Sequence, residues 1–211
     1  MAGRRAAIAG SMPTMSSPDV ARYWDEQAAT FDDEPDHGLA DPAVREAWAR
    51  LLLPLVPPAA SVADLGSGTG SLAVLLGQAG HRVSGIDIAP RMVAAARAKA
   101  AATGVAAAFA VGDAASPPWP PGTFDVVVAR HVLWALPEPD EALRRWTALL
   151  RPAGRLLLVE GRWSTGAGLS ADQVAELVLR HREAVTVTSL DDPALWGGPV
   201  DDERHLVASD R

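Results

Sequence analysis

The chain contains no cysteine, and this absence excludes disulfides, thiolate metal sites and cysteine nucleophiles. Lysine is almost absent too, since Lys99 is the only one, and the formal net charge is −7. Nucleic-acid-binding proteins usually carry a basic stripe, and none is visible here. The basic residues Arg91, Arg97 and Lys99 fall at helical spacing, and we interpret them as a solvated helix face. A small, uncharged or cationic partner is therefore favoured over a nucleic acid.

Long apolar runs are also missing, and no segment approaches the roughly 20 residues that a membrane-spanning helix needs. Residues 1–17 combine two arginines with a short, interrupted apolar stretch that is not typical of a secretory signal, so we expect a disordered tail. No His, Asp or Glu grouping has the spacing of a metal site. The sequence predicts a cytoplasmic protein, monomeric or homodimeric, with neither a membrane nor a metal partner.

What the sequence does contain is a regular alternation of strand and helix patterns. With 211 residues, 48% of them hydrophobic, the chain can bury one core, and we expect residues 18–211 to form a single domain. Such alternation predicts an α/β fold with a doubly wound, mostly parallel seven-stranded sheet, whose last strand is antiparallel. Residues 18–56 are predicted to form an N-terminal helical segment, and residues 61–209 the core. The predicted strands are 62–65, 82–86, 105–111, 124–129, 155–160, 185–190 and 203–209.

The most informative segment is the glycine turn after the first predicted strand. Gly66, Gly68 and Gly70 let the backbone turn tightly and approach a ligand that any Cβ would block. The next strand ends on Asp87, whose carboxylate can accept hydrogen bonds from two ribose hydroxyls. In an open parallel sheet both features meet at the carboxyl edge, where nucleotide-like ligands bind. The pattern therefore predicts a nucleotide-type site.

The spacing indicates which nucleotide. The dinucleotide fingerprint needs a third glycine three residues after the second, and Ser71 stands there. With Asp64 ahead of the alternating glycines, the segment instead resembles the S-adenosylmethionine site of class I methyltransferases. A nicotinamide-binding domain with a degraded motif is the alternative. The resemblance implies that Gly66, Ser67 and Gly68 present amides near the methionine portion of the cofactor, whose ammonium group Asp64 helps to hold.

The same resemblance implies further cofactor contacts. Ile88 and Met92 are expected against the adenine face, although both suit ordinary helix packing. Asp113 is expected to accept a hydrogen bond from the adenine amino group, with the Ala114 amide near a ring nitrogen, unless Asp113 caps a turn. The remaining predicted contacts are the backbone of Ala129 and Arg130 after the fourth strand and the Tyr23 side chain. The resemblance implies that residues 18–56 form an N-terminal helical lid, although Tyr23, Trp24 and Phe31 also suit a helix packed on the sheet.

Acceptor-side residues are predicted at the same edge. His131 and His37 are candidate general bases, because a histidine of near-neutral pKa can take a proton from an oxygen nucleophile. The alternative for His131 is a structural hydrogen bond, and for His37 a substrate contact. Asp36, Trp134 and Glu160 are candidate substrate contacts, with backbone hydrogen bonding as the alternative for Glu160.

The resemblance implies methyl transfer from S-adenosylmethionine to the oxygen or nitrogen of a small molecule. An alanine-rich, lysine-poor composition suggests a host with GC-rich DNA and favours natural-product biosynthesis as the setting. Two alternatives stay open. One is an RNA- or protein-modifying methyltransferase, which the acidic charge balance disfavours for RNA. The other is a non-catalytic cofactor-binding subunit.

Overall fold

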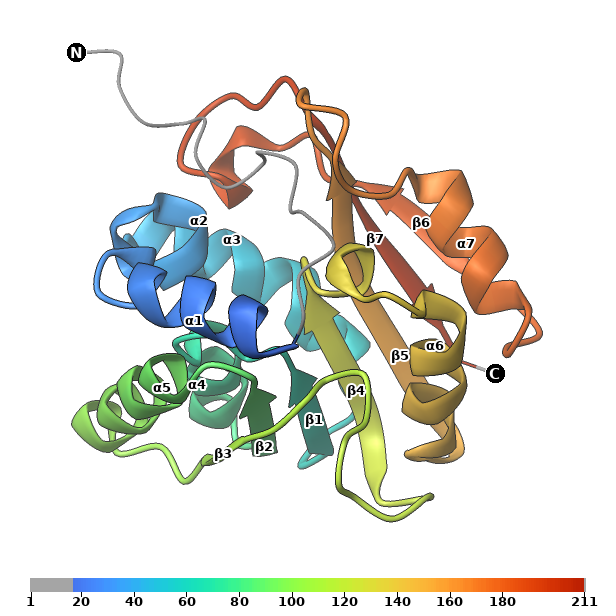
Figure 1. The fold of residues 1–211 in the computed structure, drawn as a ribbon, viewed down its shortest axis with the longest axis horizontal. Coiled ribbons are helices and arrows are strands. Elements are labelled where there is room, and N and C mark those ends of the chain that lie inside the picture. The colour runs from blue at the N-terminus through green and yellow to red at the C-terminus, as the bar shows by residue number, and fades with distance from the viewer. Residues whose placement is uncertain (1–16, 211) are drawn as a thin grey trace.

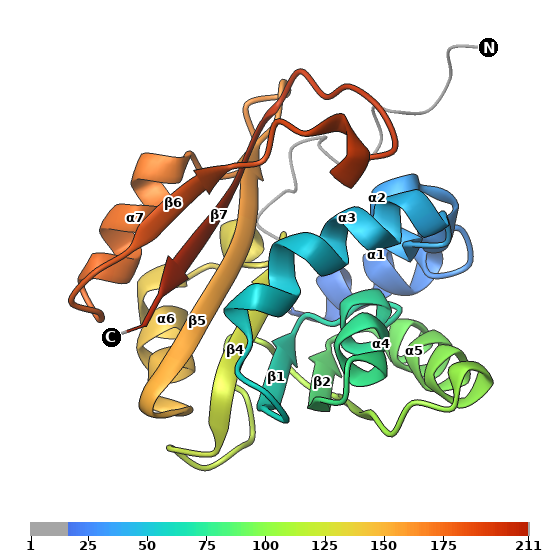
Figure 2. The same cartoon turned by 180° about the vertical axis from the view of Figure 1, so that it is seen from behind.

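The structure is a computed structural model that describes residues 17–210, with only the backbone described for Ser17 and Asp36. Of the predicted disordered tail, residues 1–16 lie outside the described part, and Ser17 begins the first helix. Seven strands form one sheet in the order β3-β2-β1-β4-β5-β7-β6 (Figures 1 and 2). They are β1 (Ser61–Leu65), β2 (Arg82–Asp87), β3 (Ala108–Val111), β4 (Phe124–Arg130), β5 (Leu150–Arg162), β6 (Thr186–Ser189) and β7 (Glu203–Ser209).

Strand direction agrees with the predicted fold class. Strands β1 to β5 pair in parallel, whereas β7 runs antiparallel to both β5 and β6. This confirms the doubly wound sheet with an antiparallel last strand. Because β7 is reversed, its first residues lie at the edge where β1, β2 and β4 end, with Arg204 opposite Gly161 and His205 opposite Glu160.

Helices cover both faces of the sheet, because neighbouring residues along a strand point to opposite sides. On one face Val62 and Val126 belong to a core cluster shared with three helices: α3 (Pro42–Leu52), α4 (Ser71–Gln78) and α5 (Pro90–Thr103). On the other face Ala63 and Val127 belong to a cluster shared with α6 (Pro139–Ala148) and α7 (Ala171–Leu179). None of the helices in the described part is both long and apolar enough to cross a bilayer.

The N-terminal segment lies beyond the carboxyl ends of β1 and β2, towards which the strand arrows point in Figure 1. It comprises α1 (Ser17–Gln27), the 3₁₀ turn η1 (Phe31–Asp33) and the single turn α2 (Pro35–Gly38) ahead of α3. Asp41 caps α3 by accepting from the Ala43 amide, and Pro42 occupies the first turn. We call residues 17–38 the lid segment below.

Two strands differ from their predicted ranges by more than one residue at an end. Strand β5 is longer than expected, because a register shift in β4 between Phe124 and Val126 lets Leu150 pair with Phe124, while Arg162 pairs with Glu203 at the other end. Strand β3 is shorter and begins only at Ala108. The described residues between β3 and β4 form the predicted proline-rich loop rather than a helix. Two further 3₁₀ turns lie near the site, η3 (Leu133–Ala135) and η4 (Pro193–Leu195).

Candidate functional site

The glycine loop has the backbone conformation that its sequence demands. Gly66, Gly68 and Gly70 all have positive φ angles, of +68°, +52° and +78°. At Gly66 an added Cβ would also collide with a Val132 methyl carbon, so conformation and close packing both require glycine. The Ser67 amide donates to the Ile86 carbonyl at 2.8 Å, which ties the loop to β2. The loop is thereby held rigidly between the ends of two strands.

Asp87 closes β2 beside this loop. Its Oδ2 accepts from the Gly68 amide at 2.8 Å and its Oδ1 from the Ala89 amide at 2.9 Å. Burial raises the pKa of Asp87, and the two amides oppose this rise. A carboxylate offers about four lone-pair sites, so each oxygen can still accept one more hydrogen bond. The residue is thus oriented and retains the capacity that a ribose diol would use.

Asp64 lies beneath the loop and is almost fully buried. Within the described part of the chain, its Oδ2 has no hydrogen-bond partner, and neither has the buried Ser67 hydroxyl. Burial raises the pKa of Asp64 to about 7, against the lowering effect of Arg130. A buried carboxylate with an unsatisfied oxygen would be stabilised by a cationic group. The residues present therefore fit the ribose and the ammonium group of S-adenosylmethionine.

The predicted adenine contacts remain predictions, because nothing in the structure tests them. Asp113 is exposed, and its Oδ1 accepts from the Ala115 amide at 2.8 Å, so it does cap a turn. Ala114 is buried, and its carbonyl accepts from the Trp146 indole. Met92 is fully buried in α5, whereas Ile88 is only partly buried.

The turn after β4 is held by a buried carboxylate. Glu160 Oε1 accepts from the amides of Val132 at 3.0 Å and Leu133 at 2.7 Å, while Oε2 has no partner. Complete burial raises the pKa of Glu160 to about 8. The Glu160 side chain thus hydrogen-bonds to the backbone of the turn, and its contact with a substrate stays a prediction. Ala129 is buried in the strand, and the Arg130 guanidinium donates to the His37 carbonyl.

His131 occupies this turn in a strained conformation. Its φ is +58°, which is uncommon for a residue other than glycine. Both ring nitrogens are buried without a hydrogen bond. Burial lowers the pKa of His131 well below its usual value, and Arg204 and Arg130 add to the effect. The imidazole is therefore neutral at pH 7, and its low basicity weakens the hypothesis that His131 is a general base.

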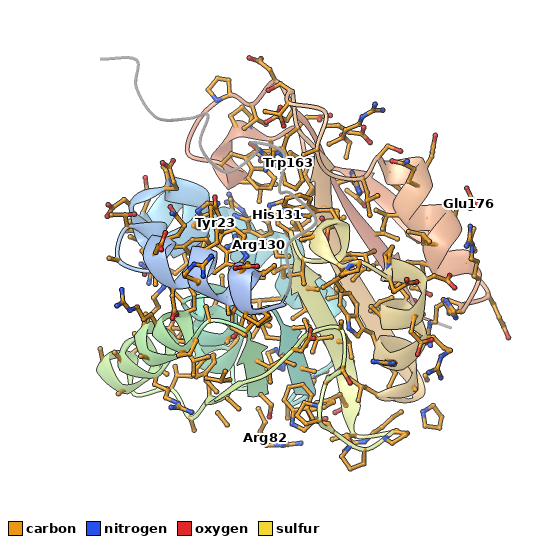
Figure 3. All side chains as sticks on the ribbon, viewed as in Figure 1. Tyr23, Arg82, Arg130, His131, Trp163 and Glu176 are labelled. Atoms are coloured by element: carbon orange, nitrogen blue, oxygen red, sulfur yellow. The ribbon has the colours of Figure 1, made fainter. Side chains whose placement is uncertain are left out.

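The lid segment packs over the glycine loop through aromatic rings. Trp24 meets Tyr23 and Phe31 edge to face, and Phe31 stacks on His37 with ring centroids 4.3 Å apart. An added Cβ on Gly68 would lie 3.4 Å from the Phe31 ring, so this ring covers the loop. Figure 3 labels Tyr23 in the same part of the view as Arg130 and His131, near the ends of the strands. The predicted contacts of Tyr23, His37 and Asp36 stay predictions.

One interpretation of the sequence is wrong. Lys99 does not belong to a solvated helix face: it donates to Ser71 at 2.7 Å and Thr69 at 3.0 Å, and pairs with Asp32 at 2.8 Å. Helical spacing shows which residues share a face but not that another segment covers it, and the lid segment covers this one. Arg97 is likewise engaged, with the Phe109 carbonyl.

Sequence reasoning also missed a cluster of rings and cations beyond the ends of β4 and β5. Trp196 meets Trp48 edge to face, and the Arg204 guanidinium lies over both Trp163 and Trp196. The signal was tryptophan placed in loops, but their partners Trp48, Arg204 and His205 come from distant parts of the chain. Among the described residues, no group of three or more His, Asp or Glu side chains could hold a metal ion.

Comparison with known proteins agrees with this geometry. Residues 63–158 match the family described as "Methyltransferase domain". Demethylmenaquinone methyltransferase of Thermus thermophilus is 39% identical over 101 residues, which are 47% of this chain and 46% of that protein. Nocamycin O-methyltransferase of Saccharothrix syringae is 42% identical over 114 residues, 51% of this chain and 41% of that protein. The chain thus spans about half the length of these relatives.

Solved structures show the fold over nearly the whole chain. The [4+2]-cyclase SpnF aligns with a TM-score of 0.77 at 19% identity, covering 95% of this chain and 98% of its own. A geranyl diphosphate C-methyltransferase from Streptomyces coelicolor A3(2) gives 0.72 at 15% identity, covering 95% and 100%. Residues 63–158, just under half of the chain, match the methyltransferase family, and the fold over nearly the whole chain is similar to that of the geranyl diphosphate C-methyltransferase. These findings agree with the resemblance to class I, S-adenosylmethionine-dependent methyltransferases.

Proposed function

We propose that this protein transfers a methyl group from S-adenosylmethionine to a small-molecule acceptor. The observation that carries the proposal is the pairing of Asp87 with the Gly68 amide above the unsatisfied carboxylate oxygen of Asp64. In this arrangement Asp87 can accept hydrogen bonds from two neighbouring hydroxyls, and Asp64 can bind a cationic group. The glycine loop between them lets a ligand approach the backbone closely.

When bound, S-adenosylmethionine supplies a methyl group that is already strongly electrophilic. The chain's own residues then need to bind, align and exclude water, since alignment of two reactants supplies much of the rate of such a transfer. Asp87 accepts from the ribose hydroxyls, and Asp64 faces the ammonium group. The lid segment, with Phe31 over Gly68, shields the loop from solvent.

We propose an oxygen or nitrogen acceptor in natural-product biosynthesis. The likeness to a nocamycin O-methyltransferase supports this setting, and the net charge of −7 disfavours RNA. SpnF, which shares the fold of this chain, is a [4+2]-cyclase, so the same fold also carries chemistry other than methyl transfer. A cofactor-binding protein without methyl transfer is therefore the second candidate.

The first experiment is calorimetric titration of the purified protein with S-adenosylhomocysteine, with a nicotinamide dinucleotide as the control ligand. Binding of the former alone supports the proposal, and preference for the dinucleotide contradicts it. A second experiment incubates the protein with methyl-labelled S-adenosylmethionine and fractionated cell extract. Label in the small-molecule fraction supports the proposal, whereas label only in RNA or protein, or in no fraction despite cofactor binding, favours the alternatives.

A further inference from the structure

The cluster beyond the ends of β4 and β5 concentrates two residue types that are rare in the chain. It holds four of the seven tryptophans and one of the five histidines, together with two arginines. These side chains come from α3, the turn after β4, the end of β5, the η4 turn and the start of β7. We call it the tryptophan–arginine cluster, and its members are Trp48, Trp134, Trp163, Trp196, Arg130, Arg204 and His131.

The tryptophans present apolar ring surface to one another rather than their polar groups. The indole N–H of Trp48 donates to the Leu195 carbonyl and that of Trp196 to the Leu190 carbonyl, both at 2.8 Å. Trp134 donates to the His131 carbonyl at 3.0 Å. Trp134 and Trp163 are only partly buried, whereas Trp48 and Trp196 are buried, so a flat ligand would pack against the edges and faces of Trp134 and Trp163.

Two guanidinium groups lie against the rings of this cluster. The Arg204 guanidinium lies 5.0 Å from the Trp196 ring centre and 5.6 Å from that of Trp163, and Arg130 lies 5.1 Å from that of Trp48. Burial lowers the pKa of His205, which disfavours its charged form. On the acidic side, Asp202 pairs with Arg204 at 3.2 Å, and Glu203 lies 3.6 Å from His205.

His131 lies at the centre of the cluster with unmet hydrogen-bonding capacity. Its ring is 5.6 Å from that of Trp163 and 6.1 Å from that of Trp196, centre to centre. Both of its nitrogens are buried and have no hydrogen-bond partner among residues 17–210, and the same holds for Arg204 Nε. Buried polar atoms are nearly always hydrogen-bonded in folded proteins. Two donors, the imidazole N–H and the guanidinium Nε, therefore await an acceptor atom at this place.

We infer that the methyl acceptor is a flat ring bearing an acidic hydroxyl, a phenol or an enol, and that this cluster binds it as the oxyanion. The inference rests on the proposed function and narrows its substrate class. Tryptophan rings hold the flat body of the acceptor, Arg204 and Arg130 balance its charge, and the neutral His131 donates a hydrogen bond to the oxyanion.

The reaction then needs no general base at the moment of transfer. The hydroxyl proton leaves to solvent when the acceptor is bound as the anion. A lone pair of the oxyanion forms the new oxygen–carbon bond as the carbon–sulfur bond breaks, and sulfur keeps the bonding pair. The products are the methyl ether and neutral S-adenosylhomocysteine. His131 acts as an orienting donor, in keeping with its low basicity.

The test uses 4-nitrophenol, whose ionised form absorbs visible light, in the presence of saturating S-adenosylhomocysteine. We expect the protein to bind the probe and to lower its apparent pKa by about one unit or more, as neighbouring cations do. The uncharged methyl ether, 4-nitroanisole, has nearly the same shape and should bind roughly tenfold more weakly or worse. Equal binding of the two probes, or an unshifted pKa, would overturn the inference.

Variants locate the effect. Arg204→Gln should abolish the shift in the pKa of the probe and weaken nitrophenolate binding roughly ten- to hundredfold, with little change for 4-nitroanisole. Trp163→Leu should weaken both probes. Arg50→Gln, which removes an exposed arginine on α3, is the matched control and should change neither. An unchanged shift in Arg204→Gln contradicts the assignment. If that variant does not fold, His131→Asn takes its place and should reduce the shift.

Failure of this inference is distinguishable from failure of the proposed function, because S-adenosylhomocysteine binding is measured first for every variant. A protein that binds S-adenosylhomocysteine but neither probe retains the proposed function and contradicts only the phenol or enol acceptor. A protein that does not bind S-adenosylhomocysteine contradicts the proposed function itself.

Discussion

The Thr69 hydroxyl of the glycine loop donates a hydrogen bond of 2.5 Å to Asp32 Oδ1 of the lid segment. Lys99 joins both residues, donating to Thr69 and pairing with the other carboxylate oxygen of Asp32. Three elements are thereby connected at one point: the lid segment, the loop after β1 and helix α5. Closure of the lid is consequently linked to the loop that we propose binds the cofactor.

The first prediction concerns this link. Asp32→Ala should speed dissociation of S-adenosylhomocysteine by roughly two- to tenfold, because a half-exposed ion pair and one hydrogen bond contribute modestly. Stopped-flow measurement of the dissociation rate checks it. Asp33→Ala removes the neighbouring, exposed carboxylate and is the matched control. If S-adenosylhomocysteine dissociates at the same rate from both variants, the contact of Asp32 with Thr69 and Lys99 does not help to retain the cofactor.

The second prediction concerns Asp87. Asp87→Ala should weaken S-adenosylhomocysteine binding by at least ten- to hundredfold, since each hydrogen bond to a charged group contributes about 1.5–3 kcal/mol. Calorimetry measures the loss, and circular dichroism confirms that the variant is folded, since the Gly68 and Ala89 amides lose their acceptor. Asp191→Ala, at an exposed position, should bind normally. Normal binding by Asp87→Ala itself would place the cofactor elsewhere.

The third prediction concerns the pH dependence of stability. The pKa of Glu160 is about 8 in the folded protein, against 4.5 as its ordinary value. Between these values the folded state holds a proton that the unfolded state releases, so the free energy of unfolding falls as pH rises. Urea unfolding at a series of pH values should show this fall, which stops above pH 8.

Glu160→Gln should make that fall shallower, because glutamine does not titrate and its amide oxygen can still accept from Val132 and Leu133. Asp64, with a pKa of about 7, contributes a fall of the same sign that ends one pH unit earlier. Asp64→Asn therefore serves as the comparison and should leave the decline between pH 7 and 8. If the free energy of unfolding depends on pH in the same way in wild type and Glu160→Gln, then Glu160 does not hold a proton in the folded state near neutral pH.

The fourth prediction separates backbone strain from steric collision in the glycine loop. Gly66→Ala should destabilise the protein by more than Gly80→Ala, since both positions have positive φ but only Gly66 also faces Val132. Strain alone costs roughly 1–2 kcal/mol. Adding Val132→Ala to Gly66→Ala should recover part of the loss. Equal losses at the two glycines would show that the collision relaxes without cost.

The fifth prediction concerns the two candidate histidines. His131→Ala and His37→Ala should leave S-adenosylhomocysteine affinity nearly unchanged while reducing turnover with an acceptor.

His131→Asn should be more thermally stable than His131→Ala, because asparagine tolerates the left-handed conformation at this position. Differential scanning fluorimetry measures the order. The reverse order would mean that the φ angle of His131 relaxes in the variants.

The succession of strands along the chain and the glycine turn that carries the proposed cofactor residues could be predicted from sequence, because both depend on local patterns. Strand 203–209 begins and ends where expected. Helix α5 begins at Pro90 and is followed by Gly104, and these two residues are local boundary signals. Asp87 could be placed at the carboxyl edge of the sheet because it ends a mostly buried strand. Each of these features is fixed by residues within a few positions of one another.

The remainder depends on contacts between distant segments. Nothing near Lys99 in the sequence indicates that Asp32 covers it, and Arg204 is 41 residues from Trp163 although the two side chains are in contact. Their meeting requires the antiparallel entry of β7, whose register cannot be derived from the strand pattern alone. The acceptor side of the site is for this reason less predictable than the cofactor side.

The reversed direction of β7 has a consequence for how such a protein can diversify. Most of the residues proposed to hold the cofactor lie between Asp64 and Ala114, whereas most of the tryptophan–arginine cluster lies between residues 130 and 204. Because the two stretches are consecutive along the chain, exchange of the C-terminal portion between homologous genes would replace most of the acceptor contacts and retain the cofactor loop. In this architecture the acceptor preference can therefore change by recombination while cofactor binding is retained.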